Sequence, residues 1–219
     1  MADIFWDFDG TVISGRIVSN AYRHHCTMIG FELSIQEMRA IEKTERFYET
    51  IQTRVETALP FHTSQEAKKT SSRLFWHAYE RELLSAGDTA FERGMQAVLG
   101  VLSEKHVLSI VTLADQQAVI RFLKKTKMLA DITHVFGTSE YERSISKQEL
   151  ARKAVKQLGR KPALMIGDRS GDILAGRTVG ACGVHVSWGN GVLNGISSEY
   201  TAKKPEDLLA IVSHELVFS

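Results

Sequence analysis

In the stretch Phe5-Trp-Asp-Phe-Asp-Gly-Thr-Val12, two acids follow directly after a short apolar run. This pattern decides how the rest of the chain is interpreted. The run from Ile4 to Trp6 predicts a buried strand. Asp7 and Asp9 leave its end at positions i and i+2, so their side chains point the same way, and Gly10 allows a sharp turn after them. Such a pair can hold a divalent cation and divide the roles of nucleophile and general acid–base.

A second pair of acids follows another apolar run later in the chain. Ile166-Gly-Asp-Arg-Ser-Gly-Asp172 comes directly after Ala163-Leu-Met. A lone carboxylate at a buried strand end is costly, so Asp168 predicts a cation or a donor beside it. Asp172 lies in the first turn of the next predicted helix, where capping and the helix dipole also favour an acid. Both a functional and a structural role for Asp172 therefore stay open.

Short apolar runs and helical patterns alternate over much of the chain. The strand-like runs are Ile4 to Trp6, Val107 to Val111, His134 to Phe136, Ala163 to Ile166 and Val184 to Val186. Between the second and third runs, Val119, Phe122 and Leu123 recur at helical spacing, with Asp115 placed to cap the helix. Another helical pattern covers residues 147–158. The alternation predicts an α/β fold with a parallel sheet that has helices on both faces.

Residues 15–88 interrupt this alternation with helix signatures alone. Ser34-Ile-Gln-Glu37 and Thr63-Ser-Gln-Glu66 match the capping-box pattern. An apolar stripe at helical spacing consists of Phe75, Ala78, Tyr79 and Leu83. We therefore expect a core of residues 1–14 and 89–219 with a helical insertion of residues 15–88.

The composition limits the classes of partner. The 219 residues include 27 Lys plus Arg and 26 Asp plus Glu, so the formal charge is only +1, and 43% of the residues are hydrophobic. These values exclude a disordered chain and favour neither a nucleic-acid nor a membrane partner. Cys26 and Cys182 match no metal-ligand spacing and are expected to be reduced thiols. With no signal-peptide pattern at the start and no run long enough to span a bilayer, a cytoplasmic location is expected. The oligomeric state stays open.

Two weaker signals lie between the acid pairs. Thr112 follows the run that ends at Val111, where its hydroxyl could donate to a phosphate oxygen, and Lys147 begins a helix after the third run. Each residue type is common, and alone each is more often structural. Their order gives them weight, because an acid pair, a threonine, a lysine and a second acid pair each come just after a strand.

Together these residues resemble the four motifs of the haloacid dehalogenase superfamily. The motifs are Asp7-Phe-Asp-Gly-Thr11, Thr112, Lys147 and Gly167-Asp-x-x-x-Asp172. The helical insertion and the glycine-rich segment from Gly180 to Gly191 are similar to those of the phosphoglycolate phosphatase-like subgroup. The resemblance implies a Rossmann-like core with an inserted helical cap that sets specificity.

The resemblance also implies a role for each motif residue. Asp7 would attack phosphorus and form an aspartyl-phosphate, and Asp9 would act as general acid and then general base. Mg²⁺ would be held by Asp7, the backbone carbonyl of Asp9 and Asp168, while Asp172 would orient Lys147 or a metal-bound water. The groups expected to bind the phosphoryl oxygens are Thr112, Lys147 and the backbone N–H groups of Phe8, Asp9 and Leu113.

The expected function is Mg²⁺-dependent hydrolysis of a small phosphorylated metabolite, with phosphoglycolate as the leading substrate. A phosphosugar mutase of the same superfamily and a non-catalytic relative that only binds phosphorylated ligands remain as alternatives. Polar candidates for substrate contact in the insertion are Arg16, His24, His25 and Arg46, although a solvated or structural role is the more ordinary one for each. Trp188 either lines the mouth of the site or anchors a loop.

Overall fold

Strand β1 (Asp3–Trp6) lies near the middle of a parallel sheet in the computed structural model, which describes residues 1–42, 47–58, 64–139 and 145–218. The sheet has six strands in the order β3-β2-β1-β4-β5-β6, and each neighbouring pair is parallel. The other strands are β2 (Val107–Asp115), β3 (His134–Thr138), β4 (Leu164–Gly167), β5 (Cys182–Val186) and β6 (Tyr200–Ala202). The strand order reverses at β1, which leaves a crevice at the carboxyl ends of β1, β2 and β4, where open α/β sheets bind ligands.

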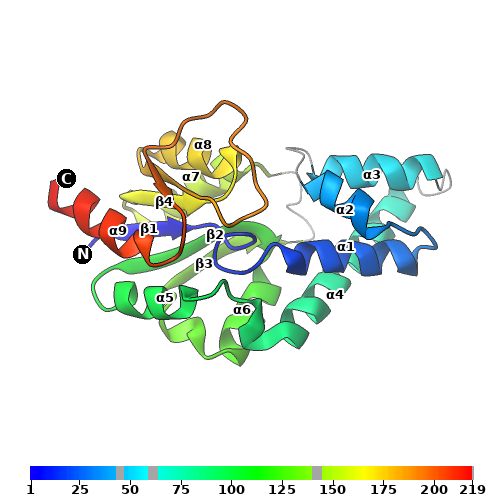
Figure 1. Ribbon diagram of the computed structural model, residues 1–219, viewed down its shortest axis with the longest axis horizontal. Helices are drawn as coiled ribbons and strands as arrows, with labels where there is room; N and C mark the ends of the chain where they lie inside the picture. The colour runs from blue at the N-terminus through cyan, green and yellow to red at the C-terminus, as the bar shows by residue number, and fades with distance from the viewer. Residues whose placement is uncertain (43–46, 59–63, 140–144, 219) are drawn as a thin grey trace.

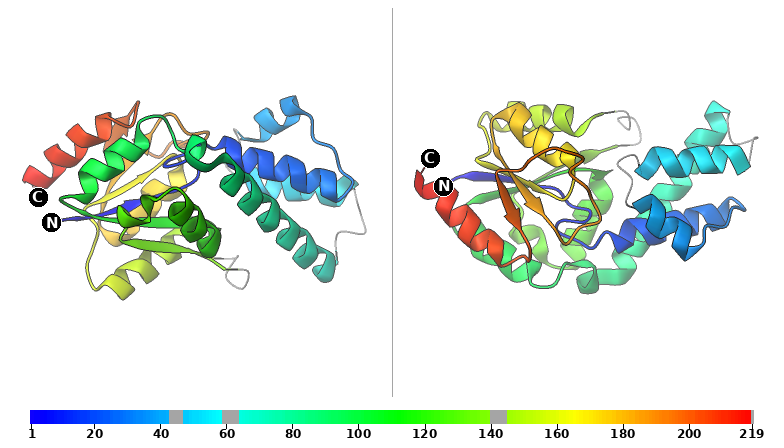
Figure 2. Two further views of the ribbon diagram at one scale, coloured as in Figure 1. Left: turned by 90° about the horizontal axis from the view of Figure 1, so that it is seen from below. Right: turned by 45° about the horizontal axis from the view of Figure 1, so that its top comes forward.

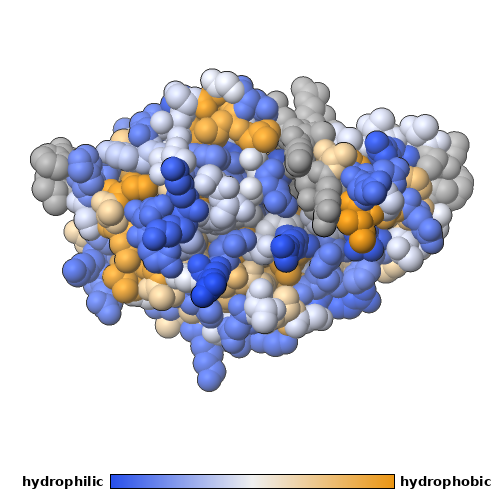
Figure 3. Space-filling model, in the orientation of Figure 1, coloured by the Kyte–Doolittle hydropathy of each residue, from blue (hydrophilic) through white to orange (hydrophobic). Residues whose placement is uncertain are grey.

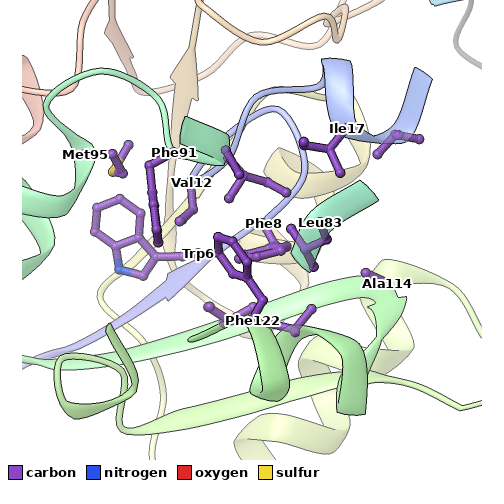
Figure 4. Packing of buried hydrophobic residues seen from close by; sticks show 14 of the residues in the cluster. Trp6, Phe8, Val12, Ile17, Leu83, Phe91, Met95, Ala114 and Phe122 are labelled. Atoms are coloured by element: carbon purple, nitrogen blue, oxygen red, sulfur yellow. The ribbon is translucent and has the colours of Figure 1, made fainter. Parts of the chain in front are cut away.

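Helices cover both faces of the sheet (Figure 1). The helices on one face are α5 (Met95–Ser103), α6 (Gln116–Lys125) and α9 (Asp207–Phe218), and those on the other are α7 (Lys147–Leu158) and α8 (Ser170–Val179). Successive residues of β1 pack on opposite faces of the sheet. Trp6 packs in the cluster that holds Phe122 (Figure 4). Phe5 packs in the cluster that holds Met165. The predicted Rossmann-like parallel sheet is confirmed.

Between β1 and α5, the described residues form four α-helices that lie beside the sheet (Figures 1 and 2). They are α1 (Arg16–Met28), α2 (Ile35–Glu42), α3 (Phe47–Ala58) and α4 (Gln65–Ala86). Helices α1 and α4 pack along each other, with the ring of Tyr22 stacked on that of Phe75 at 4.1 Å between centroids. The predicted apolar stripe of α4 is buried, and the helical insertion is confirmed.

The last turns of α4 belong to the packing of the core. Glu80 forms an ion pair with Arg121 of α6, and the Lys125 ammonium donates to the Leu84 carbonyl at 2.7 Å. Leu83 is fully buried in the hydrophobic cluster that also holds Phe8 (Figure 4). Helix α4 therefore runs from the insertion onto α6, and one hydrophobic cluster is continuous between the two regions.

Helix starts follow the predicted caps with one correction. Ser34 and Glu37 form the expected capping box, in which each backbone N–H donates to the other's side chain. Helix α4, however, is capped by Ser64, whose hydroxyl oxygen accepts from the Ala67 N–H at 3.1 Å. Thr63 and Pro60 lie outside the described residues.

Several elements of the sheet differ from the sequence prediction. Strand β2 continues to Asp115, four residues beyond the predicted end, and its pairing with β3 shifts register after Val111. Asp115 still caps α6 as expected, because its carboxylate accepts from the Ala118 N–H at 2.8 Å. Strand β6, helix α5 and two short 3₁₀ turns, Gly87–Ala90 and Met128–Ala130, were not predicted.

The surface is mixed in character. Hydrophilic residues cover most of the face in Figure 3 and are interrupted by smaller apolar patches. Within the described ranges, no helix has both the length and the apolar composition that a bilayer crossing requires.

Candidate active site

The turn after β1 presents the first acid pair at the carboxyl edge of the sheet. The Asp7 N–H donates to the Ile166 carbonyl at 2.8 Å, which continues the pairing of β1 with β4. Gly10 then adopts a positive φ of 80°. A side chain at this position would also meet Asp168, because a Cβ on Gly10 would lie 2.6 Å from its Oδ2. Glycine is therefore required both for the turn and for the approach of the second acid.

The glycine-rich segment after β5 packs against Asp168. The Gly191 N–H donates to Oδ2 of Asp168 at 2.8 Å, and a Cβ on Gly189 would lie 2.4 Å from the Cβ of Asp168. The Trp188 indole N–H donates to the Thr11 carbonyl at 3.0 Å. Of the two roles left open for Trp188, the structure shows that of a loop anchor, which ties this segment to the first motif.

Lys147 joins the two acid pairs. As predicted, it is the first residue of α7, where Ser146 and Glu149 form a capping box. Its ammonium donates to Oδ1 of Asp7 and lies 3.0 Å from Oδ1 of Asp172, and all three side chains are buried. The other oxygen of Asp172 accepts from the Arg169 N–H at 3.0 Å. Asp172 thus fills the structural role of a cap for α8 and also contacts the lysine.

Three buried carboxylates converge in a way that suits a cation. One oxygen from each of Asp7, Asp168 and Asp172 lies within 4.8 Å of the others. Among the described residues, the buried Oδ1 of Asp168 has no hydrogen-bond partner, and Nε of Arg169 is 3.9 Å away, beyond hydrogen-bond range. Carboxylate oxygens are the ligands that Mg²⁺ prefers in proteins. The donor set and the unpartnered oxygen therefore fit Mg²⁺.

The pKa values of the clustered residues also fit a bound cation. Burial raises the pKa of Asp7 to about 6, helped by repulsion from Asp172, and raises the pKa of Asp168 to about 8, helped by repulsion from Asp7. Burial and the charge of Asp7 raise the pKa of Asp9 to about 7. Burial opposes the charge of Lys147, yet attraction from Asp172 and Asp7 raises its pKa above the ordinary value. A bound divalent cation would offset the repulsion and release protons from the carboxyls.

Most of the predicted residues line one cavity of about 210 Å³, whereas Asp168 and Phe8 are not part of its wall. Its wall consists of Asp7, Asp9, Thr112, Leu113, Ala114, Lys147, Arg169, Ser170, Gly171, Asp172 and Val192. Thr112 is buried within β2, and its hydroxyl oxygen accepts from the Ala114 N–H at 3.1 Å, which leaves the hydroxyl proton to donate elsewhere. The side chain of Phe8 packs in the hydrophobic core and is not available to the cavity.

Sequence reasoning missed several residues near this cavity, among them two with side chains that suit chemistry, Arg169 and Tyr79. Arg169, the residue after Asp168, forms part of its wall. Tyr79 of α4 donates its hydroxyl to Oδ1 of Asp9 at 2.9 Å. The sequence shows the tyrosine only as a member of an apolar stripe; the available signal is that a buried tyrosine hydroxyl needs a partner.

Of the polar candidates of the insertion, the three that the structure describes are not part of the cavity wall. His24 is paired with Glu82 at 2.8 Å, and buried His25 bonds through Nε2 to the Ser71 hydroxyl at 2.8 Å. Arg16 is exposed at the start of α1, and Arg46 lies outside the described residues. As far as the structure describes the chain, the core alone supplies the cavity wall.

Comparison with known proteins agrees with this geometry. Residues 4–186 match the family model of haloacid dehalogenase-like hydrolases. Pyrophosphatase PpaX of Bacillus cereus (strain AH820) is 32% identical over 149 residues, which are 66% of this chain and 67% of that protein.

Two solved structures show the same fold. A predicted phosphoglycolate phosphatase from Haemophilus somnus 129pt superposes with a TM-score of 0.78 at 15% identity, over 97% of this chain and 98% of that chain. The β-phosphoglucomutase of Clostridium difficile gives 0.74 at 15% identity, over 98% and 96%. The family match spans both acid pairs and confirms the resemblance seen in the motifs: the chain is an enzyme that belongs to the haloacid dehalogenase-like hydrolase family.

Proposed function

We propose that this hydrolase is a Mg²⁺-dependent phosphatase that cleaves a small phosphomonoester through a phosphorylated Asp7. The observation that carries the proposal is one cavity, at the carboxyl edge of the sheet, in which Asp7 and Asp9 meet Lys147 beside the carboxylate of Asp168. Names of similar proteins support it, since they include a pyrophosphatase and a predicted phosphatase.

Asp7 is suited to be the nucleophile. Its carboxylate is fixed by the Lys147 ammonium at Oδ1, and the Thr11 hydroxyl lies 3.4 Å from Oδ2. In the proposed reaction, an oxygen of Asp7 bonds to phosphorus as the bond to the ester oxygen breaks, and Asp9 gives that oxygen its proton. Asp9 then takes a proton from a water that attacks phosphorus, which releases orthophosphate and restores Asp7.

The cation and the phosphoryl group would be held by separate sets of groups. Asp7, Asp168 and the backbone carbonyl of Asp9 would hold Mg²⁺, which supplies positive charge that lets a carboxylate approach a phosphate dianion. Asp172 would orient Lys147, to which it is already bonded. The donors to the phosphoryl oxygens would be Thr112, Lys147 and the backbone N–H groups of Phe8, Asp9 and Leu113.

The substrate is proposed to be small. Many ligand pockets enclose about 300–1,000 Å³, and the cavity here is smaller, about 210 Å³. We assign residues 15–88 as a cap that adds specificity by closing over the cavity. The thiols of Cys26 and Cys182 are free, which supports a cytoplasmic place of action.

A panel of phosphorylated compounds tests the proposal. The panel contains phosphoglycolate, sugar phosphates, nucleoside monophosphates and inorganic pyrophosphate, and the readout is orthophosphate release with Mg²⁺ and with a chelator. We expect Mg²⁺-dependent release that is fastest for a small phosphomonoester. If no compound releases orthophosphate with Mg²⁺, the proposal is wrong.

The two alternatives give different results on the same panel. A mutase, favoured by the structural likeness to β-phosphoglucomutase, would convert a sugar phosphate into an isomer with little free phosphate. If the protein is a non-catalytic binder, one of the compounds would raise its thermal midpoint, and that compound would stay unchanged.

A further inference from the structure

We propose that Tyr79, a residue of the helical insertion, is a positioning residue that holds the carboxyl of Asp9 for proton transfer to the leaving group. The inference rests on the proposed function, because it concerns how the acid of that reaction is oriented. It assigns a part in the chemistry to a residue whose sequence context predicts only packing.

The contact itself is specific. The Tyr79 side chain is only 1% exposed, and its hydroxyl donates to Oδ1 of Asp9 at 2.9 Å. Among the hydrogen bonds of the described residues, this is the one that reaches the Asp9 side chain. A carboxyl held at one oxygen keeps its second oxygen for the proton that the ester oxygen must receive. Tyr79 therefore determines which way the acid faces.

The tyrosine is fixed on its own side as well. Its ring lies edge-on to Trp76 at 5.5 Å between centroids and 6.3 Å from Phe75. Leu83, four residues later and so on the same face of α4, is fully buried in the hydrophobic cluster that also holds Phe8 (Figure 4). One residue after the tyrosine, Glu80 is paired with Arg121 of α6.

These contacts couple the insertion to the acid. Because the end of α4 is bound to α6, the hydroxyl of Tyr79 is presented to Asp9 from a helix that the core itself holds in place. The placement of α4 on α6 thereby becomes a condition for the orientation of Asp9.

Leaving-group dependence separates this role from a packing role. An alkoxide needs a proton as it leaves, whereas p-nitrophenolate leaves without one. We compare kcat/KM for glycerol phosphate and for p-nitrophenyl phosphate, because kcat/KM covers the step in which the leaving group departs. The hydrolysis of the phosphorylated Asp7, in which Asp9 acts as a base for either substrate, affects kcat.

For Tyr79→Phe we expect kcat/KM for glycerol phosphate to fall about 10- to 100-fold, the size of a lost hydrogen bond to a charged group. For p-nitrophenyl phosphate we expect a change below about threefold, since a lost donor to the acid matters little when no proton is needed. Phenylalanine keeps the ring contacts, so the variant should fold, and its thermal midpoint is measured alongside.

Tyr200→Phe is the matched control. Tyr200 lies on strand β6, at the edge of the sheet, and its hydroxyl donates to Glu215 at 2.7 Å. The Tyr200→Phe variant should hydrolyse both substrates as the wild type does. An equal fall for both substrates in Tyr79→Phe, or no fall for either, would overturn the inference while the proposed function stands. A wild-type protein that releases phosphate from neither substrate, nor from the wider panel, would overturn both.

Discussion

The carboxyl edge of the sheet and the helical insertion differ in the kind of contacts that their buried residues make. At the edge, buried charges contact one another, as Lys147 does with Asp7 and Asp172. In the insertion, the described interior is mainly apolar and aromatic, and charged pairs such as Arg54 with Glu37 lie at the surface. The edge requires particular residue types, whereas many apolar sequences can fill the insertion. Substitutions at the edge should therefore remove activity, and substitutions in the insertion away from Tyr79 should lower stability.

The largest effect is expected for Asp7→Asn. An amide cannot attack phosphorus, so turnover should fall roughly 10⁴-fold or more, as when a nucleophile is removed. Circular dichroism should show an unchanged fold, because Asn keeps the shape of the side chain. Asp131→Asn, remote from the cavity and bonded to Ser103, is the control and should retain activity. Retained turnover in Asp7→Asn would show that the edge does not act as proposed.

An apolar truncation in the insertion should show the opposite behaviour. Ile51 of α3 is 1% exposed, so Ile51→Ala should lower the free energy of unfolding by about 3 kcal/mol through lost burial and a residual cavity. Its kcat/KM for p-nitrophenyl phosphate should stay within about threefold of the wild type. Ile35→Ala, at a 54% exposed position of α2, should change neither quantity. A large loss of kcat/KM in Ile51→Ala at full stability would mean that the insertion takes part directly in the chemistry.

Cation binding at the edge should stabilise the folded protein against thermal unfolding. At a Mg²⁺ concentration 100 times its Kd, binding to the folded state alone adds about 2.7 kcal/mol. We expect the thermal midpoint of the wild type to rise with Mg²⁺ and that of Asp168→Asn to stay constant, because the variant loses a carboxylate of the cluster. Asp88→Asn, at an exposed site, should respond as the wild type does. An equal rise in Asp168→Asn would place the cation elsewhere.

The smallest effect should come from a helix cap of the insertion. The Ser34 hydroxyl accepts from the Glu37 N–H at 3.2 Å. Ser34→Ala should cost about 1 kcal/mol of stability, a typical value for a lost N-cap. Activity should be unchanged, and chemical denaturation measured beside the turnover assay checks both statements. A fall in turnover would contradict the separation between the two regions.

The residues at the carboxyl edge can be predicted from the sequence because short local patterns mark them, and because a buried acid without a partner is energetically costly. An acid at the end of a buried strand, as at Asp7 and Asp168, is hard to explain without a partner, and Ser146 and Glu149 mark the helix that begins at Lys147. These positions meet because parallel strands bring their carboxyl ends to one side of the sheet.

Other features depend on contacts that no local pattern reports. The bond between Tyr79 and Asp9 joins positions 70 residues apart and requires α4 to be placed on the core first. Strand β6 is three residues long and has no apolar run, because it only extends the sheet edge beside β5. The continuation of β2 to Asp115 depends on its pairing with Thr138 of β3.

A crystal grown with Mn²⁺ in place of Mg²⁺ tests the convergence of the acids most directly, because anomalous scattering locates the ion. We predict a single strong peak in the crevice, about 2.0–2.3 Å from a carboxylate oxygen of Asp7, a carboxylate oxygen of Asp168 and the backbone carbonyl of Asp9. A peak bound by other residues, or an empty crevice at saturating Mn²⁺, would contradict the account.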